Sequence, residues 1–200
     1  MRLATIRTGD TTTAARIVGD GRAVALGAND VGAVLRTGAY EEGEEFTFAP
    51  ADLAPVVPRP GKIICVGLNY AKHIAEMGHE QPDVPTLFIK FPEALIGAHD
   101  VAEVPDFNAD ALDFEGELAV IIGSRARHAT DGAKHIAGYS VINDCSQREY
   151  QNRTKQWHQG KSLEKTAGFG PWLDTEWQPG PAITTTVNGE VMQHAPTDDL

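Results

Sequence analysis

Short apolar runs, separated by glycines, prolines and polar turns, dominate the hydrophobic pattern of this chain. Runs of about four to eight residues rich in branched and aromatic side chains are typical of strands. Such runs occupy 3–7, 15–18, 23–26, 62–67, 87–90, 113–122, 138–142, 184–187 and 190–192, with a weaker one at 101–104. The pattern therefore predicts a protein of many short strands with few helices.

Turn and cap signals divide these runs. The segment 19–22 and the pair Asn188-Gly189 each separate two apolar runs, which predicts two β-hairpins. Asn29 or Asp30 can cap a short helix that ends near Gly38. Helical character is also expected at 69–77, 131–136 and 145–157.

Prolines mark a boundary early in the chain. Pro55, Pro58 and Pro60 are followed by Gly61, and such spacing interrupts regular structure. We therefore expect a small β-rich N-terminal domain at 1–57 and a larger domain at 58–200.

An acidic strand at 113–118 is the most informative stretch. Side chains alternate between the faces of a strand, so Asp113, Glu115 and Glu117 should point the same way. Three neighbouring carboxylates repel each other unless water screens them or a cation lies among them. Hard divalent cations favour carboxylate oxygens, whereas the alternative is a solvated acidic face.

Two further clusters could carry chemistry. His73 and Glu76 are spaced as neighbours on one helix face, where a carboxylate orients an imidazole as a general base requires. Asp144 follows the strand at 138–142 and is spaced to share one side of a helix with Arg148 and Gln151. Arg148 could bind a substrate carboxylate with two nitrogens. Each cluster could also be an ordinary solvated surface group.

Composition and net charge exclude some kinds of binding partner. The net charge is −11 and the hydrophobic content 42%, so a nucleic-acid or anionic-membrane partner is not expected. No run approaches the length of a membrane span, and the two cysteines fit no zinc spacing. We expect a soluble, cytoplasmic protein with reduced thiols.

Four ordered motifs resemble the fumarylacetoacetate hydrolase family. The segment 67–76 is similar to the family's G-x-N-Y-x-x-H-x-x-E, and 114–118 to its E-x-E strand. Residues 143–151 resemble its segment with a third metal carboxylate, and Lys161-Ser162 followed by Gly170-Pro171 resembles its K-S … G-P segment. The family continues beyond the point matched by Leu200, so 58–200 is expected to be an incomplete catalytic domain.

This resemblance implies a mainly β, α+β fold, a mixed β-roll with a small N-terminal β-rich domain. It implies Mg²⁺ or Mn²⁺ as cofactor, a small anionic 2-oxo acid as substrate and a homodimer. The residue roles that it implies are as follows: metal ligands Glu115, Glu117 and Asp144; catalytic groups His73, Glu76 and Lys161; substrate contacts Tyr70, Arg148 and Gln151.

The implied reaction is metal-dependent hydrolysis of a carbon–carbon bond in an acylpyruvate through a stabilised enolate. His73, oriented by Glu76, would activate water, and Lys161 would stabilise oxyanion charge. The same site could instead serve an isomerase, a hydratase or a decarboxylase of a 2-oxo acid such as oxaloacetate. A catalytically silent scaffold is the non-enzymatic alternative.

Overall fold

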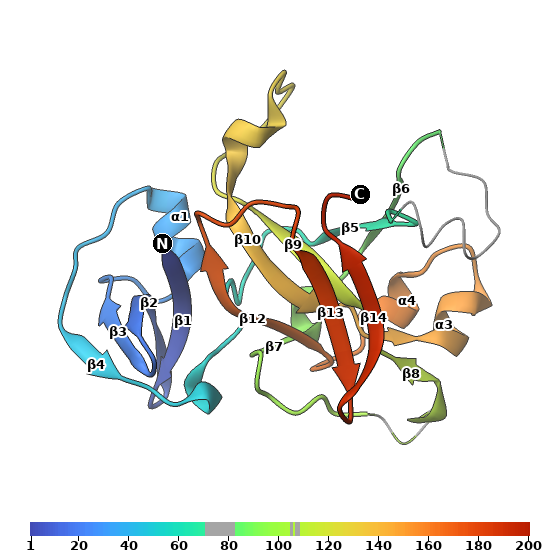
Figure 1. The fold of residues 1–200 in the computed structure, drawn as a ribbon, viewed down its shortest axis with the longest axis horizontal. Coiled ribbons are helices and arrows are strands. Elements are labelled where there is room, and N and C mark those ends of the chain that lie inside the picture. Colours follow the sequence, from blue (N-terminus) through green and yellow to red (C-terminus); the bar gives the residue numbers. More distant parts are fainter. Residues whose placement is uncertain (71–82, 105, 107–108) are drawn as a thin grey trace.

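The computed structural model describes residues 1–200 except 71–82, 105 and 107–108. Its fold is mainly β with short helices, of the α+β class that the sequence predicts. One eight-stranded sheet and three two-stranded ladders make up the described β-structure, and none of the sheets closes on itself (Figure 1). Among the described residues, no helix has the length and apolar content needed to cross a membrane.

The N-terminal residues form an antiparallel meander with one helix against it. Its elements are β1 (Arg2–Thr8), β2 (Thr11–Gly19), β3 (Arg22–Ala25), α1 (Val31–Thr37) and β4 (Glu45–Thr47). The predicted hairpin joins β2 and β3. The predicted helix cap is also confirmed, because an oxygen of Asp30 accepts from the Ala33 backbone N–H at 2.7 Å. Gly38 ends α1 with a left-handed φ of 66°.

The large sheet joins this meander to the later strands. Its order is β4-β3-β2-β1-β12-β10-β9, with β12 at Ala167–Asp174, β10 at Ile136–Asn143 and β9 at Gly116–Ile122. β1 pairs antiparallel with β12 through Leu3 and Leu173. A short strand, β7 (Leu95–Ile96), pairs parallel with β12. The predicted domain division at 57/58 therefore lies between segments that share one sheet.

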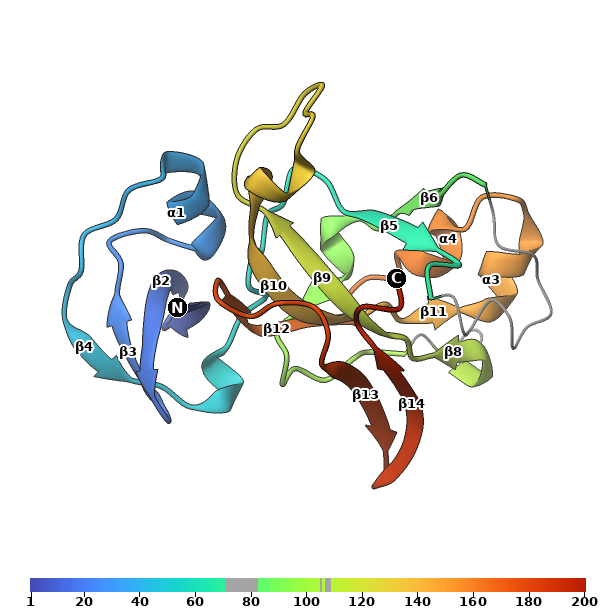
Figure 2. The ribbon, with the colours of Figure 1, turned by 45° about the horizontal axis from the view of Figure 1, so that its top comes forward.

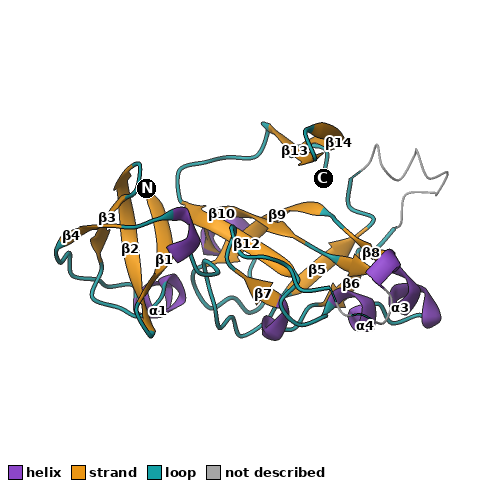
Figure 3. Ribbon diagram, turned by 90° about the horizontal axis from the view of Figure 1, so that it is seen from below, coloured by secondary structure: helices purple, strands orange, loops and turns teal. Residues whose placement is uncertain are grey.

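Smaller elements surround β9 and β10. The three ladders are β5 (Ile64–Gly67) with β6 (Thr86–Ile89), β8 (Leu112–Asp113) with β11 (Ser146–Gln147), and β13 (Ala182–Val187) with β14 (Glu190–Pro196). Two helices, α3 (Arg148–Arg153) and α4 (His158–Lys161), pack against each other. Four 3₁₀ turns are η1 (Pro50–Asp52), η2 (Pro92–Ala94), η3 (Ala109–Ala111) and η4 (Gly132–His135). Figure 3 shows the β13–β14 hairpin on one side of β9 and β10, and α3 and α4 on the other.

The main apolar core lies between α1 and the centre of the large sheet (Figure 2). It combines Leu26 and Val31 from the N-terminal segment with Ile121 and Phe169 from the later strands. Burial of this shared cluster stabilises the attachment of the meander to β12 and β9.

Two sequence predictions of strands are wrong. Residues 101–104 have no regular secondary structure. The acidic strand is not continuous, because β8 ends at Asp113 and β9 begins at Gly116. The backbone changes partner there, since β8 pairs with β11 whereas β9 pairs with β10. An oxygen of Asp113 accepts from the Phe114 backbone N–H at 2.9 Å, and the Asn143 side chain accepts from that of Glu115 at 3.1 Å.

Candidate active site

Antiparallel pairing of β9 and β10 brings the three predicted metal ligands to one end of the sheet. Glu117 lies opposite Ile142 in the register. The backbone N–H of Asp144 donates to the carbonyl of Glu115 at 2.8 Å. The carboxylates of Glu115 and Asp144 both affect the titration of Glu117, so the three groups form one electrostatic cluster. The three carboxylates therefore influence one another, and their role as a metal site stays a prediction.

Gly116 separates the two glutamates for a steric reason. A Cβ at this position would lie 2.2 Å from Oγ1 of Thr185 on β13. Its backbone N–H also donates to the side-chain oxygen of Gln193 on β14 at 2.9 Å. The glycine therefore lets the β13–β14 hairpin cover the backbone between Glu115 and Glu117.

Close packing of two helices positions Lys161. A Cβ on Gly160 would lie 2.5 Å from the backbone nitrogen of Gln151 and 2.7 Å from the carbonyl of Gln147. Gly160 therefore allows α4 to approach α3 more closely than any other residue could. Lys161 is the last residue of α4.

Lys161 lies between two of the carboxylates. Its Nζ is 2.6 Å from Oε2 of Glu115 and 3.0 Å from Oδ2 of Asp144, and its side chain is only 3% exposed. A second lysine, Lys90, contacts the other oxygen of Asp144 at 2.9 Å. The cation that the crowded carboxylates require is thus supplied within the chain by buried ammonium groups.

Arg148 binds the outer part of the same cluster. Its guanidinium contacts Asp113 at 2.6 Å and Glu115 at 2.7 Å, and donates to the side-chain oxygen of Gln151 at 2.8 Å. Burial lowers the pKa of Arg148, but the hydrogen bond to Asp113 and the charge of Glu115 outweigh burial and raise it above its ordinary value. Because its side chain is still 37% exposed, Arg148 can reach an entering anion.

Glu117 is the carboxyl group of the cluster that is hardest to ionise. Burial, the largest cause, acts together with the charges of Glu115 and Asp144 and against the charge of Lys161, and the net effect raises the pKa of Glu117 to about 7. No described residue forms an ion pair with Glu117 within 4 Å. The energetic cost of ionising Glu117 indicates a site that accepts additional positive charge.

The titration of Glu117 predicts a pH dependence of stability in protein kept free of divalent ions with a chelator. Between its ordinary value of 4.5 and the folded value of about 7, the folded state binds more protons than the unfolded state. The free energy of unfolding should therefore fall as pH rises through this window, by up to about 3 kcal/mol. Urea titrations at pH 5 to 8 measure this slope. The Glu117→Gln variant should lose this component, and an unchanged slope in the variant would contradict the prediction.

The remaining predicted site residues are Tyr70, His73 and Glu76. The Tyr70 hydroxyl is buried near Glu117; burial first, and then the Glu117 charge, raises the pKa of Tyr70 to about 12. His73 and Glu76 fall outside the described residues. Close before them, Leu68 adopts a left-handed φ of 54°, an uncommon conformation for a branched side chain.

Lys90 is the site residue that the sequence reasoning missed. Its side chain is fully buried, and it donates to the carbonyls of Cys145 and Lys161 in addition to pairing with Asp144. A signal was present, because Lys90 directly ends the apolar run 87–89, where a buried lysine requires a carboxylate partner. Its partners are distant in sequence, so the run alone could not identify them.

The donor set fits a hard divalent cation in chemistry but not yet in arrangement. Glu115, Glu117 and Asp144 supply carboxylate oxygens, which are the ligands that Mg²⁺ and Mn²⁺ prefer. As they stand, no three His, Cys, Asp or Glu side chains in the described part of the chain are grouped to hold a metal ion. The ammonium of Lys161 takes up the position between Glu115 and Asp144.

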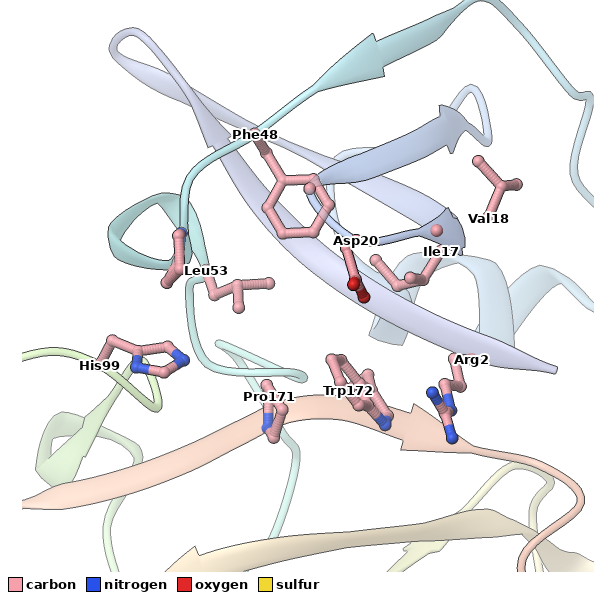
Figure 4. A pocket seen from close by; sticks show the side chains of 12 residues that line it. Arg2, Ile17, Val18, Asp20, Phe48, Leu53, His99, Pro171 and Trp172 are labelled. Carbon is pink, nitrogen blue, oxygen red and sulfur yellow. The ribbon is translucent and has the colours of Figure 1, made fainter.

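A separate hollow lies on the other side of β12. It has a volume of about 640 Å³ and lies between the N-terminal meander and β12, with Phe48, Leu53 and Trp172 in its lining (Figure 4). None of the predicted site residues lines it. The carboxylate cluster, and not this hollow, therefore remains the candidate active site.

Comparison with known proteins agrees with this fold. The sequence profile described as "Fumarylacetoacetate (FAA) hydrolase C-terminal" matches residues 62–200. The chain therefore belongs to the fumarylacetoacetate hydrolase family.

Relatives that are named for an activity include two oxaloacetate tautomerases. Mitochondrial FAHD2A of Bos taurus is 40% identical over 74% of this chain and 49% of its own length. YisK of Bacillus subtilis (strain 168) is 35% identical over 78% of this chain and 54% of its own length. The chain thus spans about half the length of these curated relatives.

Solved structures match over nearly the whole chain. The 5-carboxymethyl-2-hydroxymuconate delta-isomerase from Mycobacterium smegmatis has a TM-score of 0.85 and 30% identity. The match covers 99% of this chain and 76% of that chain. The mainly β architecture predicted from the resemblance is confirmed.

Proposed function

We propose that this chain acts as an isomerase of a small 2-oxo acid, moving a proton between the keto and enol forms of an oxaloacetate-like dicarboxylate. This belongs to the isomerase, hydratase and decarboxylase alternative stated above, which has more support than acylpyruvate hydrolysis. Two relatives are named oxaloacetate tautomerases, and a structural neighbour is named a delta-isomerase.

The observation that carries the proposal is the set of cationic nitrogens around the carboxylate cluster. Arg148 is half-buried and Lys161 is almost fully buried, and both contact Glu115. Keto–enol isomerisation requires stabilisation of enolate charge and movement of a proton, but no attacking water. Hydrolysis additionally requires a base that activates water, a role predicted for His73, which lies outside the described residues.

Each described residue has a distinct role in this proposal. Glu115, Glu117 and Asp144 would hold Mg²⁺ or Mn²⁺, and a bound divalent ion supplies Lewis-acid stabilisation of enolate charge. Arg148, oriented by Gln151, binds a substrate carboxylate. Lys161 holds a proton at Nζ and stabilises the enolate oxygen.

Ketonisation of enol-oxaloacetate, followed by its ultraviolet absorbance, tests the proposal directly. The reaction should accelerate with added Mg²⁺ or Mn²⁺ and return to the uncatalysed rate with excess chelator. Parallel assays with acetylpyruvate and fumarylpyruvate measure hydrolysis, and release of CO₂ from oxaloacetate measures decarboxylation.

The four readouts separate the alternatives. Cleavage of an acylpyruvate without accelerated ketonisation would favour the hydrolase, and CO₂ release alone would favour the decarboxylase. Folded protein that neither binds metal nor catalyses any of these reactions would favour the scaffold. The homodimer stays a prediction, and sedimentation velocity of the 200-residue chain would test it.

A further inference from the structure

Every carboxylate oxygen of Glu115 and Asp144 contacts a cationic nitrogen of the chain. Lys161 contacts one oxygen of each residue, at 2.6 Å and 3.0 Å. Arg148 contacts the second oxygen of Glu115 at 2.7 Å, and Lys90 contacts the second oxygen of Asp144 at 2.9 Å. The two oxygens shared by Lys161 are the pair that a cation between the strands would have to use.

One position cannot hold both an ammonium group and a divalent ion. Glu115 and Asp144 would hold a divalent ion through their carboxylate oxygens, and one oxygen of each now contacts the Lys161 Nζ. A divalent ion and an ammonium group that shared these oxygens would repel each other strongly in a buried site. We propose that Lys161 is a tethered counter-ion, which neutralises the carboxylates in the metal-free protein and leaves them when a divalent ion binds. This inference rests on the metal site of the proposed function.

The structure distinguishes the lysine that can move from the one that cannot. Lys90 has a fully buried side chain that forms an ion pair with Asp144 and donates hydrogen bonds to the backbone carbonyls of Cys145 and Lys161. Its bond to the Lys161 carbonyl also anchors the backbone of α4 at that residue. Among the described residues, the Lys161 side chain, by contrast, makes polar contacts with the two carboxylates alone.

An aromatic ring offers the released ammonium group a second contact. The Nζ of Lys161 lies 5.1 Å from the centroid of the Phe88 ring, within the range of a cation–π interaction. Rotation of the side chain can therefore take the ammonium group off the carboxylates while it stays beside Phe88. The displaced group would then face the same site as the half-exposed Arg148, where it can contact a substrate oxygen.

Displacement makes the lysine a competitor of the metal. Removal of its charge should free one oxygen of Glu115 and one of Asp144, while Arg148 and Lys90 keep their contacts with the other two oxygens, so that a divalent ion binds more tightly. We expect the Lys161→Met variant to bind Mn²⁺ at least about tenfold more tightly than the wild type, which corresponds to 1.4 kcal/mol. Lys134→Met is the matched control, because Lys134 is an exposed lysine that forms a surface ion pair with Asp131.

Calorimetric titration of the 200-residue chain with Mn²⁺ measures these affinities, and the rise in melting temperature on adding Mn²⁺ provides a second readout. Tighter binding and a larger rise in Lys161→Met, with Lys134→Met unchanged, support the proposal. Equal or weaker binding in Lys161→Met overturns it and leaves the metal site intact. Failure of both wild type and Lys161→Met to bind Mn²⁺ would overturn the proposed function as well.

The wild-type protein provides a test that does not depend on the variant folding. Reductive methylation with peptide mapping measures the reactivity of each lysine with and without Mg²⁺. Lys161 should become several-fold more reactive when Mg²⁺ binds, because its ammonium group loses both carboxylate contacts, whereas Lys90 should remain unreactive. Calorimetric Mg²⁺ binding without a change at Lys161 would overturn the displacement.

Discussion

Replacement of Asp144 by asparagine should lower the free energy of unfolding of the metal-free protein by about 3 kcal/mol or more. The carboxylate neutralises two ammonium groups at once, since Lys90 lies 2.9 Å from one oxygen and Lys161 lies 3.0 Å from the other. Both lysine side chains are almost inaccessible to water, so neither can recover its lost partner by hydration. A buried charge without a partner costs more than the ion pair itself contributes.

Urea denaturation of the variant and the wild type in the presence of a chelator measures this difference. Asp131→Asn is the matched control, because Asp131 pairs at 3.3 Å with Lys134 on the surface. Exposed pairs of this kind contribute about 1 kcal/mol or less. A loss in Asp144→Asn no larger than that of the control would contradict the assignment of Asp144 as the buried anion of the cluster.

Replacement of Glu115 by glutamine should reduce turnover of enol-oxaloacetate by about 100-fold or more. Glu115 contacts both Lys161 and Arg148 and lies beside Asp144, so its charge orients two proposed substrate-binding cations as well as the predicted metal. Glutamine keeps the size of the side chain and one acceptor oxygen but removes the negative charge. The variant therefore separates the charge of Glu115 from its packing.

Turnover and Mn²⁺ affinity should be measured on the same preparations. If turnover and Mn²⁺ affinity both fall, Glu115 binds the metal. If turnover falls alone, Glu115 acts by orienting Lys161 and Arg148. Glu42→Gln is a suitable control, since Glu42 forms an exposed pair with Arg16 far from the cluster in the N-terminal meander. Wild-type activity in Glu115→Gln would contradict the assignment of the carboxylate cluster as the active site.

Local signals in the sequence predicted the local elements well. The cap at Asp30 and the turn at Asn188-Gly189 depend on neighbouring residues, and both are present. The interruption at Phe114 and Glu115 was not predictable in the same way. It arises because the chain exchanges one partner strand for another, and strand partners are fixed by tertiary structure.

The residues of the candidate site also differ in whether the sequence could predict them. The resemblance to the family implied one metal site made of Glu115, Glu117 and Asp144, whereas alternation along the acidic segment grouped Asp113, Glu115 and Glu117 on one strand face. Lys90 was missed because its partners, Asp144 and the carbonyls at 145 and 161, lie more than fifty residues away in sequence. Buried counter-ions are chosen by proximity in the fold, which spacing along one segment does not reveal.

Pairing of β1 with β12 has a consequence for how the protein folds. Leu3 reaches its partner Leu173 only after most of the chain has been made. Contacts between such distant residues slow folding, because a long loop must close before they form. During synthesis the outer edge of β1 is therefore an unpaired strand edge, open to association with other chains. Expression yield should then depend on how quickly residues 167–174 emerge and cover that edge.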